Sequence, residues 1–226
     1  TYSFYDVWAE EFRIPYKQIP LDRNFTICPE DYAGENGGIV FPNPNAPTGK
    51  LLPLEDVERI IAQNPDVIVI VDEAYIDFGG TSALPLIDKY DNVLVVQTFS
   101  KSRSMAGMRI GYAMAQPELI KYLNDVKYSF NYYTLNSLTI EMGTAAILDE
   151  AYFKETTQKI IATRERTKEE LRALGYRMDD SKSNFLFVTH DTISMEKLFE
   201  DLKKKGIALI YITHRLTEVF EIATHV

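Results

Sequence analysis

The feature that most constrains the fold is a series of short apolar runs, rich in Val and Ile, that alternate with helical patterns. Residues 66–71 are continuously apolar after the first residue, which predicts a strand buried on both faces of a sheet. Residues 38–41, 93–96 and 109–113 are further runs of this kind, and residues 54–63 place apolar side chains on one side of a helix. This alternation predicts an α/β fold with a mostly parallel sheet between helices.

The second part of the chain has a different pattern, which begins near Pro117 with longer helices. Residues 150–174 are charged, with apolar residues at helical spacing, and suit a long connector helix. After it, residues 184–188 predict a strand, residues 194–205 a helix and residues 208–212 another strand. We therefore expect a small α+β unit at the C-terminal end.

These patterns divide the chain into two expected domains. Its 226 residues are enough for one large α/β domain with a smaller appendage. The change of pattern puts the boundary between residues 155 and 175. We assign residues 1–160 to a large domain, incomplete at its N-terminus, and residues 161–226 to the connector and the small domain.

Charge and cysteine content exclude several classes of function. The chain has 24 basic and 33 acidic residues and a formal charge of −9, which argues against nucleic-acid and anionic-membrane partners. No apolar run approaches the length of a membrane span, and no signal peptide is visible. Because Cys28 is the only cysteine, no internal disulfide or cysteine-based metal site can form. We expect no metal and a reducing, cytoplasmic setting.

Lys101 is the first candidate for chemistry. It follows the predicted strand 93–96 at the carboxyl end, where open α/β sheets build their sites. A lysine placed there can attack an aldehyde if its surroundings partly deprotonate its amine. On its own, Lys101 would be better interpreted as a solvated loop residue, so the interpretation depends on its neighbours.

Asp72 ends another apolar strand, where a carboxylate is costly to bury without a cation or hydrogen-bond donors. A protonated pyridine nitrogen would supply that partner. Tyr75, three residues later, could donate its hydroxyl to a phenolic oxygen of the same ring. The alternatives are a structural hydrogen bond for Asp72 and a core position for Tyr75.

Thr98, Ser100 and Arg109 surround Lys101 in the sequence. Two hydroxyls and a guanidinium are suitable donors for a phosphate dianion, and the alternative is turn chemistry beside a surface arginine. Residues 43–49 form a turn rich in Pro and Asn after the first strand, and its amide side chains could face a ligand. Each signal is weak alone, but each comes at the end of a successive strand.

Together these motifs make the sequence resemble the fold-type I aminotransferases, most closely the histidinol-phosphate aminotransferase branch. The residues that carry the resemblance are the turn 43–49, Asp72-Glu73-Ala74-Tyr75, Thr98-Phe99-Ser100-Lys101, residues 106–112 and Ser183-Asn184-Phe185. The resemblance runs from residue 1 to about residue 207. It implies a fold-type I large domain followed by a small α+β domain.

The resemblance also assigns roles to residues around pyridoxal phosphate. Lys101 would hold this cofactor as a Schiff base and act as the base and acid of the proton transfer. Arg109 would bind the phosphate together with Thr98 and Ser100, and Tyr2 would stack on the ring. The cofactor-binding set expected is Tyr2, Asp72, Tyr75, Thr98, Ser100, Lys101 and Arg109.

The implied activity is the transfer of an amino group from histidinol phosphate to 2-oxoglutarate, in histidine biosynthesis. Small amino-acid and keto-acid substrates, and a homodimer, follow from the same resemblance. Four departures matter. The family segment before Tyr2 is absent, Ala46 stands where an asparagine is usual, Glu221 stands where an arginine is usual, and residues 209–212 lack the arginine that usually precedes the tyrosine. Asn45 or Asn43 could compensate for Ala46.

Two other functions compete with this one. The departures favour a non-catalytic fragment or fusion that keeps only part of the cofactor site. Residues 210–223 are also similar to the switch-histidine segment of ABC-transporter ATPases, with His214 as the histidine. The chain has no Gly-x-x-x-x-Gly-Lys-[Ser/Thr] phosphate loop, so a nucleotide-binding protein is the remote alternative and His214 is interpreted as a loop residue.

Overall fold

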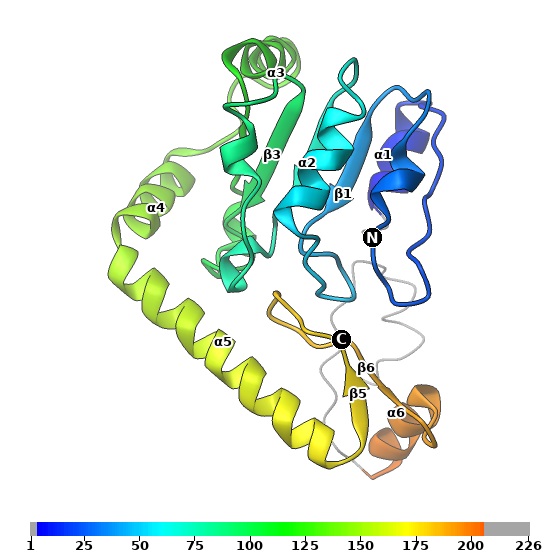
Figure 1. Cartoon of the computed structure of the whole chain (residues 1–226). Coiled ribbons are helices and arrows are strands. Elements are labelled where there is room, and N and C mark those ends of the chain that lie inside the picture. The colour runs from blue at the N-terminus through cyan, green and yellow to red at the C-terminus, as the bar shows by residue number, and fades with distance from the viewer. Residues whose placement is uncertain (1–3, 206–226) are drawn as a thin grey trace.

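The computed structural model of the chain describes residues 4–205 and contains two sheets joined by a long helix (Figure 1). The α-helices are α1 Phe4–Glu11, α2 Leu54–Ala62, α3 Pro117–Phe130, α4 Ser137–Leu148, α5 Glu150–Ala173 and α6 Met195–Lys204. The strands are β1 Ile39–Pro42, β2 Val69–Asp72, β3 Val93–Thr98, β4 Gly111–Met114, β5 Tyr176–Met178 and β6 Val188–His190. Short 3₁₀ turns are η1 Pro29–Tyr32, η2 Ile76–Phe78, η3 Leu84–Leu86 and η4 Ala106–Met108.

The larger sheet has the strand order β1-β2-β3-β4. Strands β1, β2 and β3 are parallel, and β4 runs antiparallel to β3. The register pairs Pro42 with Asp72 and Asp72 with Val96, so the three parallel strands end at one edge. This confirms the expected α/β class and brings the loops that follow these strands together.

The core lies between this sheet and α2. On α2, Val57, Ile60 and Ile61 are fully buried, and they share one core with Val69 and Val71 of β2. The spacing of the three helix residues places them on one side of α2, and alternation along β2 turns its valines to the same face. Burial of this apolar surface fixes the helix against the strands.

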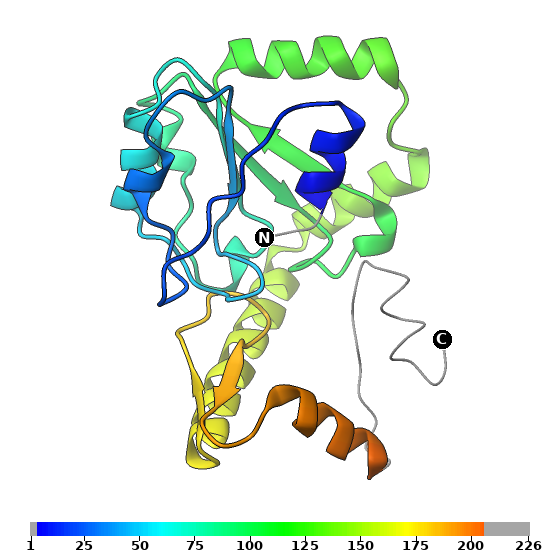
Figure 2. The same ribbon diagram turned by 90° about the vertical axis from the view of Figure 1, so that its right-hand side faces the viewer.

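The opposite face of the sheet is only partly covered, which corrects the expectation of a strand buried on both faces. Ile70 is half-buried between two fully buried valines, and Val40 of β1 is 41% exposed. Helix α1 lies on the face opposite α2 (Figure 2) but has no buried residue. Within residues 4–205, α1 therefore leaves much of this face accessible to solvent.

The smaller sheet pairs β5 with β6 in antiparallel orientation. Helix α5 runs from α4 to this sheet, and the carboxyl ends of the parallel strands face toward it (Figure 1). The predicted helix 150–174 is thus confirmed almost to the residue, while β5 was not predicted. The division into domains 1–160 and 161–226 stays a prediction.

Two predicted strands begin later than the apolar pattern indicates. Residues 66–68 precede β2 because the Asn92 amide donates to the carbonyls of Asn64 (2.8 Å) and Val67 (3.1 Å), which occupies these groups in a turn. Residues 184–187 precede β6 because serine hydroxyls bind the carbonyl of Phe185 in place of a neighbouring strand.

The fourth strand of the large sheet also starts after its predicted first residue. Arg109 was expected to begin it, but it ends the η4 turn with φ +55°, a left-handed conformation that a strand does not contain. None of the described helices is long and apolar enough to cross a membrane.

Several sequence predictions fall outside the described residues. These are the ring-stacking Tyr2, the strand 208–212, His214 and Glu221.

Candidate active site

The site residues predicted from separate strands come together at the carboxyl edge of the large sheet. Lys101 follows β3, and its Nζ lies 5.2 Å from the centre of the Tyr75 ring. Tyr75 is buried and follows β2. Burial raises the pKa of Asp72, and the positive charge of Lys101 is close enough to oppose that rise. The parallel register explains this meeting, because neighbouring strands end side by side.

Asp72 is a partly buried carboxyl group with two described donors. The Tyr5 hydroxyl donates to its Oδ2 at 2.5 Å, and the Ala74 backbone N–H donates to its Oδ1 at 3.1 Å. Burial raises the pKa of Asp72 above its usual value, while these bonds and Lys101 oppose the rise. A cationic ring nitrogen would favour the carboxylate further.

Tyr5 is a site residue that the sequence analysis missed. Burial, the charge of Asp72 and the hydrogen bond to it hold the pKa of Tyr5 far above its usual range, so the phenol stays protonated and acts as a donor. A signal was available in the sequence, because Tyr5 stands in the aromatic-rich segment that begins at Tyr2.

The predicted phosphate donors lie around the turn after β3. Thr98 Oγ1 donates to Ser100 Oγ (2.9 Å) or to the Ile110 carbonyl (3.1 Å), and it accepts from the Ser100 N–H (3.1 Å). Arg109 is exposed, and its Nη1 donates to the Ala106 carbonyl at 3.0 Å. A guanidinium has five N–H donors, so this bond leaves Arg109 others for an anion.

The 43–49 turn separates the two asparagines that could replace the missing one. Asn43 is buried, with its Nδ2 donating to the Leu52 carbonyl (3.1 Å) and its Oδ1 accepting from the Leu52 N–H (2.8 Å). Its amide is therefore occupied within the loop. Asn45 donates from Nδ2 to Thr48 Oγ1 at 2.8 Å, and its Oδ1 accepts no hydrogen bond from another described residue. Asn45 is the better candidate.

Residues 181–185, here called the serine segment, bring the small sheet to this edge. The Lys182 N–H donates to the Gly49 carbonyl at 2.8 Å. The Phe185 ring meets the Tyr75 ring edge-on, with centroids 5.0 Å apart. The predicted Ser183-Asn184-Phe185 motif is therefore a neighbour of the Lys101 site.

Glu73 is a buried carboxyl group next to Asp72, and the sequence did not predict a role for it. Glu73 is 1% exposed and accepts hydrogen bonds from Ser82 Oγ (2.7 Å), the Ala83 N–H (2.6 Å) and Gln97 Nε2 (2.8 Å). Burial raises the pKa of Glu73 above its usual value, against the effect of these donors. Through Gln97 of β3, this network attaches the loop that contains Glu73 and Tyr75 to that strand.

Two cavities lie beside the site. One, of about 510 Å³, lies between α5 and residues 184–188, and Arg164 and Phe185 line it. The other, of about 500 Å³, lies between residues 102–108 and helices α4 and α5. Lys101 and Asp72 line neither of these two cavities.

Comparison with known proteins decides the family. The family described as aminotransferase class I and II matches residues 1–219 of this chain. The chain belongs to the class I and II aminotransferase family. Among its curated relatives, a histidinol-phosphate aminotransferase of Lactococcus lactis subsp. cremoris is 52% identical over 207 residues, which are 92% of this chain and 58% of the relative. One of Clostridium acetobutylicum is 50% identical over 211 residues, 93% of this chain and 60% of the relative.

Solved aminotransferase structures confirm the expected fold type. The histidinol-phosphate aminotransferase of Clostridium acetobutylicum superposes with a TM-score of 0.82 at 27% identity, over 91% of this chain and 64% of that one. That of Sinorhizobium meliloti, solved in complex with pyridoxal phosphate, has a TM-score of 0.60 at 29% identity, over 67% of this chain and 42% of that one. The aminotransferase resemblance expected from the sequence is confirmed.

Proposed function

We propose that this chain is the greater part of a pyridoxal-phosphate-dependent histidinol-phosphate aminotransferase. The observation that carries the proposal is the meeting of Asp72, Tyr75 and Lys101 at the ends of adjacent strands, in a chain about half identical to curated enzymes of that name. The chain spans 58% and 60% of the length of those two relatives. Its reaction, histidinol phosphate with 2-oxoglutarate in histidine biosynthesis, is part of the proposal.

The residues at the edge fit pyridoxal phosphate group by group. The Asp72 carboxyl suits the ring nitrogen, and the Tyr75 hydroxyl suits the phenolic oxygen. Lys101 is the amine for the aldehyde. The Thr98 and Ser100 hydroxyls and the Arg109 guanidinium suit the phosphate. When bound, the cofactor supplies an electron sink for the amino-acid carbon.

The protein's own part of the chemistry is to place these groups and move a proton. Lys101, held beside Tyr75, is the base and acid that moves the proton at the substrate carbon. Asp72 keeps the ring nitrogen protonated because a buried carboxylate stabilises an adjacent cation. Tyr2, Glu221 and the substrate's own contacts stay predictions of the sequence.

The test is cofactor capture by the purified chain. With added pyridoxal phosphate we expect a visible absorption band, and borohydride reduction should fix the cofactor to Lys101, as read by peptide mass. Lys101→Ala should abolish both, whereas Lys127→Ala, a lysine on α3, should change neither. Absence of a band in the unaltered chain would sink the proposal.

Amino transfer is measured separately from cofactor capture. We expect formation of glutamate from 2-oxoglutarate when histidinol phosphate is supplied. Weak or absent capture together with no transfer would instead support the non-catalytic alternative, which keeps only part of the cofactor site. Ordinary turnover by this chain alone would exclude that alternative.

A further inference from the structure

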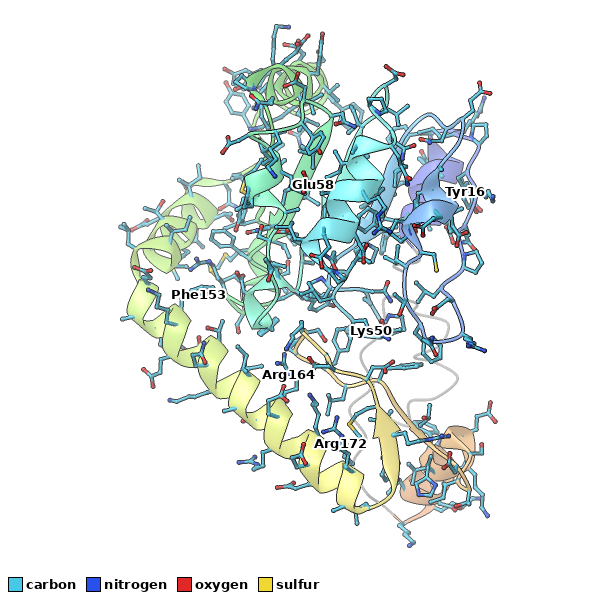
Figure 3. All side chains as sticks on the ribbon, viewed as in Figure 1. Tyr16, Lys50, Glu58, Phe153, Arg164 and Arg172 are labelled. Atoms are coloured by element: carbon cyan, nitrogen blue, oxygen red, sulfur yellow. The ribbon has the colours of Figure 1, made fainter. Side chains whose placement is uncertain are left out.

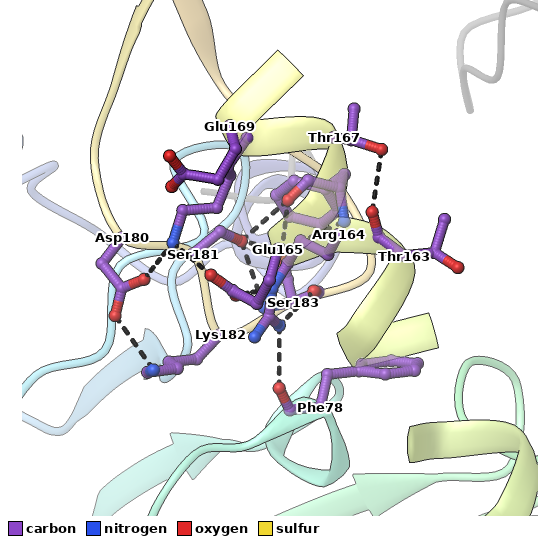
Figure 4. A network of polar contacts seen from close by, with 12 residues as sticks. Phe78, Thr163, Arg164, Glu165, Thr167, Glu169, Asp180, Ser181, Lys182 and Ser183 are labelled. Atoms are coloured by element: carbon purple, nitrogen blue, oxygen red, sulfur yellow. Dashed lines mark hydrogen bonds and ion pairs between the residues drawn. The ribbon is translucent and has the colours of Figure 1, made fainter. Parts of the chain in front are cut away.

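Arg164 is a buried cation that the proposed function does not use. It lies on α5, and its side chain is 4% exposed. Its Nη1 donates to the carbonyls of Phe78 and Ser183, both at 2.8 Å, and its Nε donates to Glu165 at 2.9 Å (Figure 4). The two carbonyls belong to segments far from each other in the sequence. Arg164 therefore joins the large sheet's loops to the serine segment.

The two segments that Arg164 joins carry the aromatic residues of the site. Phe78 ends the η2 turn, which directly follows Tyr75. Ser183 lies two residues before Phe185, whose ring contacts the Tyr75 ring at 5.0 Å. Tyr75 in turn lies 5.2 Å from Lys101. A displacement of either segment would thus move the ring that stands against Lys101.

Charged residues also join α5 to the segment just before the serine segment. Lys168, one turn along α5, donates to Asp180 at 2.5 Å and to Glu165 at 2.7 Å. Lys182 forms a further ion pair with Asp180 at 2.9 Å. The hydrogen bonds and charges of Lys168 and Lys182 lower the pKa of Asp180 to about 2. Figure 3 shows Arg164 pointing from α5 into this junction, whereas Arg172 lies nearer the far end of the helix.

An arginine is required there for a chemical reason. A buried cation is stable only if its N–H groups find acceptors, and the planar guanidinium reaches two carbonyls and a carboxylate at fixed angles. A lysine ammonium is a point charge on a flexible stem and cannot hold three acceptors in one plane.

We propose that Arg164 is a positioning residue that sets the place of the serine segment against Tyr75, and through Tyr75 the geometry at Lys101. It is not a catalytic residue, because the junction separates it from Lys101. The effect of Arg164 on the cofactor rests on the proposed function. The bonds from Arg164 to the carbonyls of Phe78 and Ser183, here called the clamp, can be tested without cofactor.

The first experiment measures the clamp by hydrogen exchange. In Arg164→Met we expect the amide of Lys182 to exchange roughly tenfold faster or more, because all three charge-assisted bonds of the guanidinium are lost, while the amides of β2 keep their rates. Arg166→Met is the matched control, since Arg166 is 69% exposed on the same helix, and it should leave both unchanged. Unchanged exchange in Arg164→Met would overturn the proposal.

Arg164→Lys keeps the experiment decisive if the methionine variant does not fold. We expect Arg164→Lys to fold. The backbone amides of β2 should stay fully protected from exchange, while the Lys182 amide should still exchange faster than in the unaltered chain. Full protection at Lys182 in this variant would overturn the need for a guanidinium.

The second experiment measures the effect of Arg164 on the cofactor site. With pyridoxal phosphate bound, Arg164→Lys should move the pH midpoint of the visible band by roughly half a unit or more, because Tyr75 is displaced, and Arg166→Met should not. A purely structural Arg164 would lower the melting temperature and leave the midpoint in place. If the unaltered chain shows no band, the proposed function fails, while the exchange result still decides the clamp.

Discussion

Single residues at the sheet edge control the protonation of their neighbours, and Tyr5 shows this most directly. Its hydroxyl donates to Asp72 and lowers the pKa of that carboxyl, against the rise caused by burial. This bond offsets part of the rise and so favours the carboxylate, the form that a cationic ring nitrogen would require. A carboxylate can accept several bonds, so Tyr5 and the cofactor can share it.

Tyr5→Phe should therefore weaken cofactor binding. We expect the dissociation constant for pyridoxal phosphate to rise by roughly tenfold, which corresponds to one hydrogen bond to a charged acceptor, as measured by absorbance titration. Tyr16→Phe removes a hydroxyl from a half-exposed tyrosine and serves as the control. Equal dissociation constants in the unaltered chain and in Tyr5→Phe would contradict this role.

Glu73 should make stability depend on pH. Its pKa is raised from 4.5 in the fold, so the folded chain binds this proton more tightly than the unfolded chain does. Its contribution to the free energy of unfolding is complete below pH 4.5 and is lost as the pH rises through the folded pKa. In Glu73→Gln we expect this fall to disappear in urea titrations at several pH values. A parallel pH profile in the two proteins would refute it.

At the scale of elements, the 43–49 turn and the serine segment are fitted to each other. Gly49 has φ +74°, and a Cβ there would meet Ser181 Oγ at 2.2 Å. Only glycine allows this backbone conformation and this close approach without strain. The turn is thus part of the docking surface for the small sheet as well as of the site.

Gly49→Ala should undock the serine segment. We expect a loss of more than about 1 kcal/mol in the free energy of unfolding, measured by denaturant titration. Gly37→Ala is the control, because a Cβ at Gly37 meets nothing within 4 Å and its φ is not positive. Equal losses in the two variants would show that the contact with Ser181 has no energetic weight.

At the scale of the whole molecule, the most exposed large apolar side chains of the described chain lie at α3, α4 and the segment between them. Around α3 and α4, Phe130 is 91% exposed, Tyr133 87% and Leu148 78%. An apolar surface of this kind is typical of a protein contact. It supports the homodimer implied by the resemblance, which stays a proposal.

Association of the chain can be measured directly. By sedimentation we expect a dimer or larger species, and the double variant Phe130→Ser, Tyr133→Ser should shift it toward monomer, because apolar burial drives such contacts. Tyr152→Ser, at a tyrosine 65% exposed on α5, is a comparison outside these two helices. A monomeric unaltered chain would contradict the homodimer.

Much of the fold could be predicted from the sequence alone. Apolar periodicity identified the strands of the large sheet, α2 and α5, because burial on a sheet or helix imposes a repeat of two or 3.6 residues. The motifs that hold Asp72, Tyr75, Lys101 and Arg109 also carried the resemblance to the aminotransferase family. These are local patterns that each segment carries by itself.

Tertiary structure decided what depends on partners distant in sequence. The Tyr5 bond to Asp72, the occupied amide of Asn43 and the clamp of Arg164 on Phe78 and Ser183 have no periodic signature. A buried polar side chain must find acceptors or donors wherever the fold supplies them, so its partners follow from packing. The sequence by itself determined which groups are proposed to meet the cofactor. The packing decided how those groups are held and which asparagine stays available.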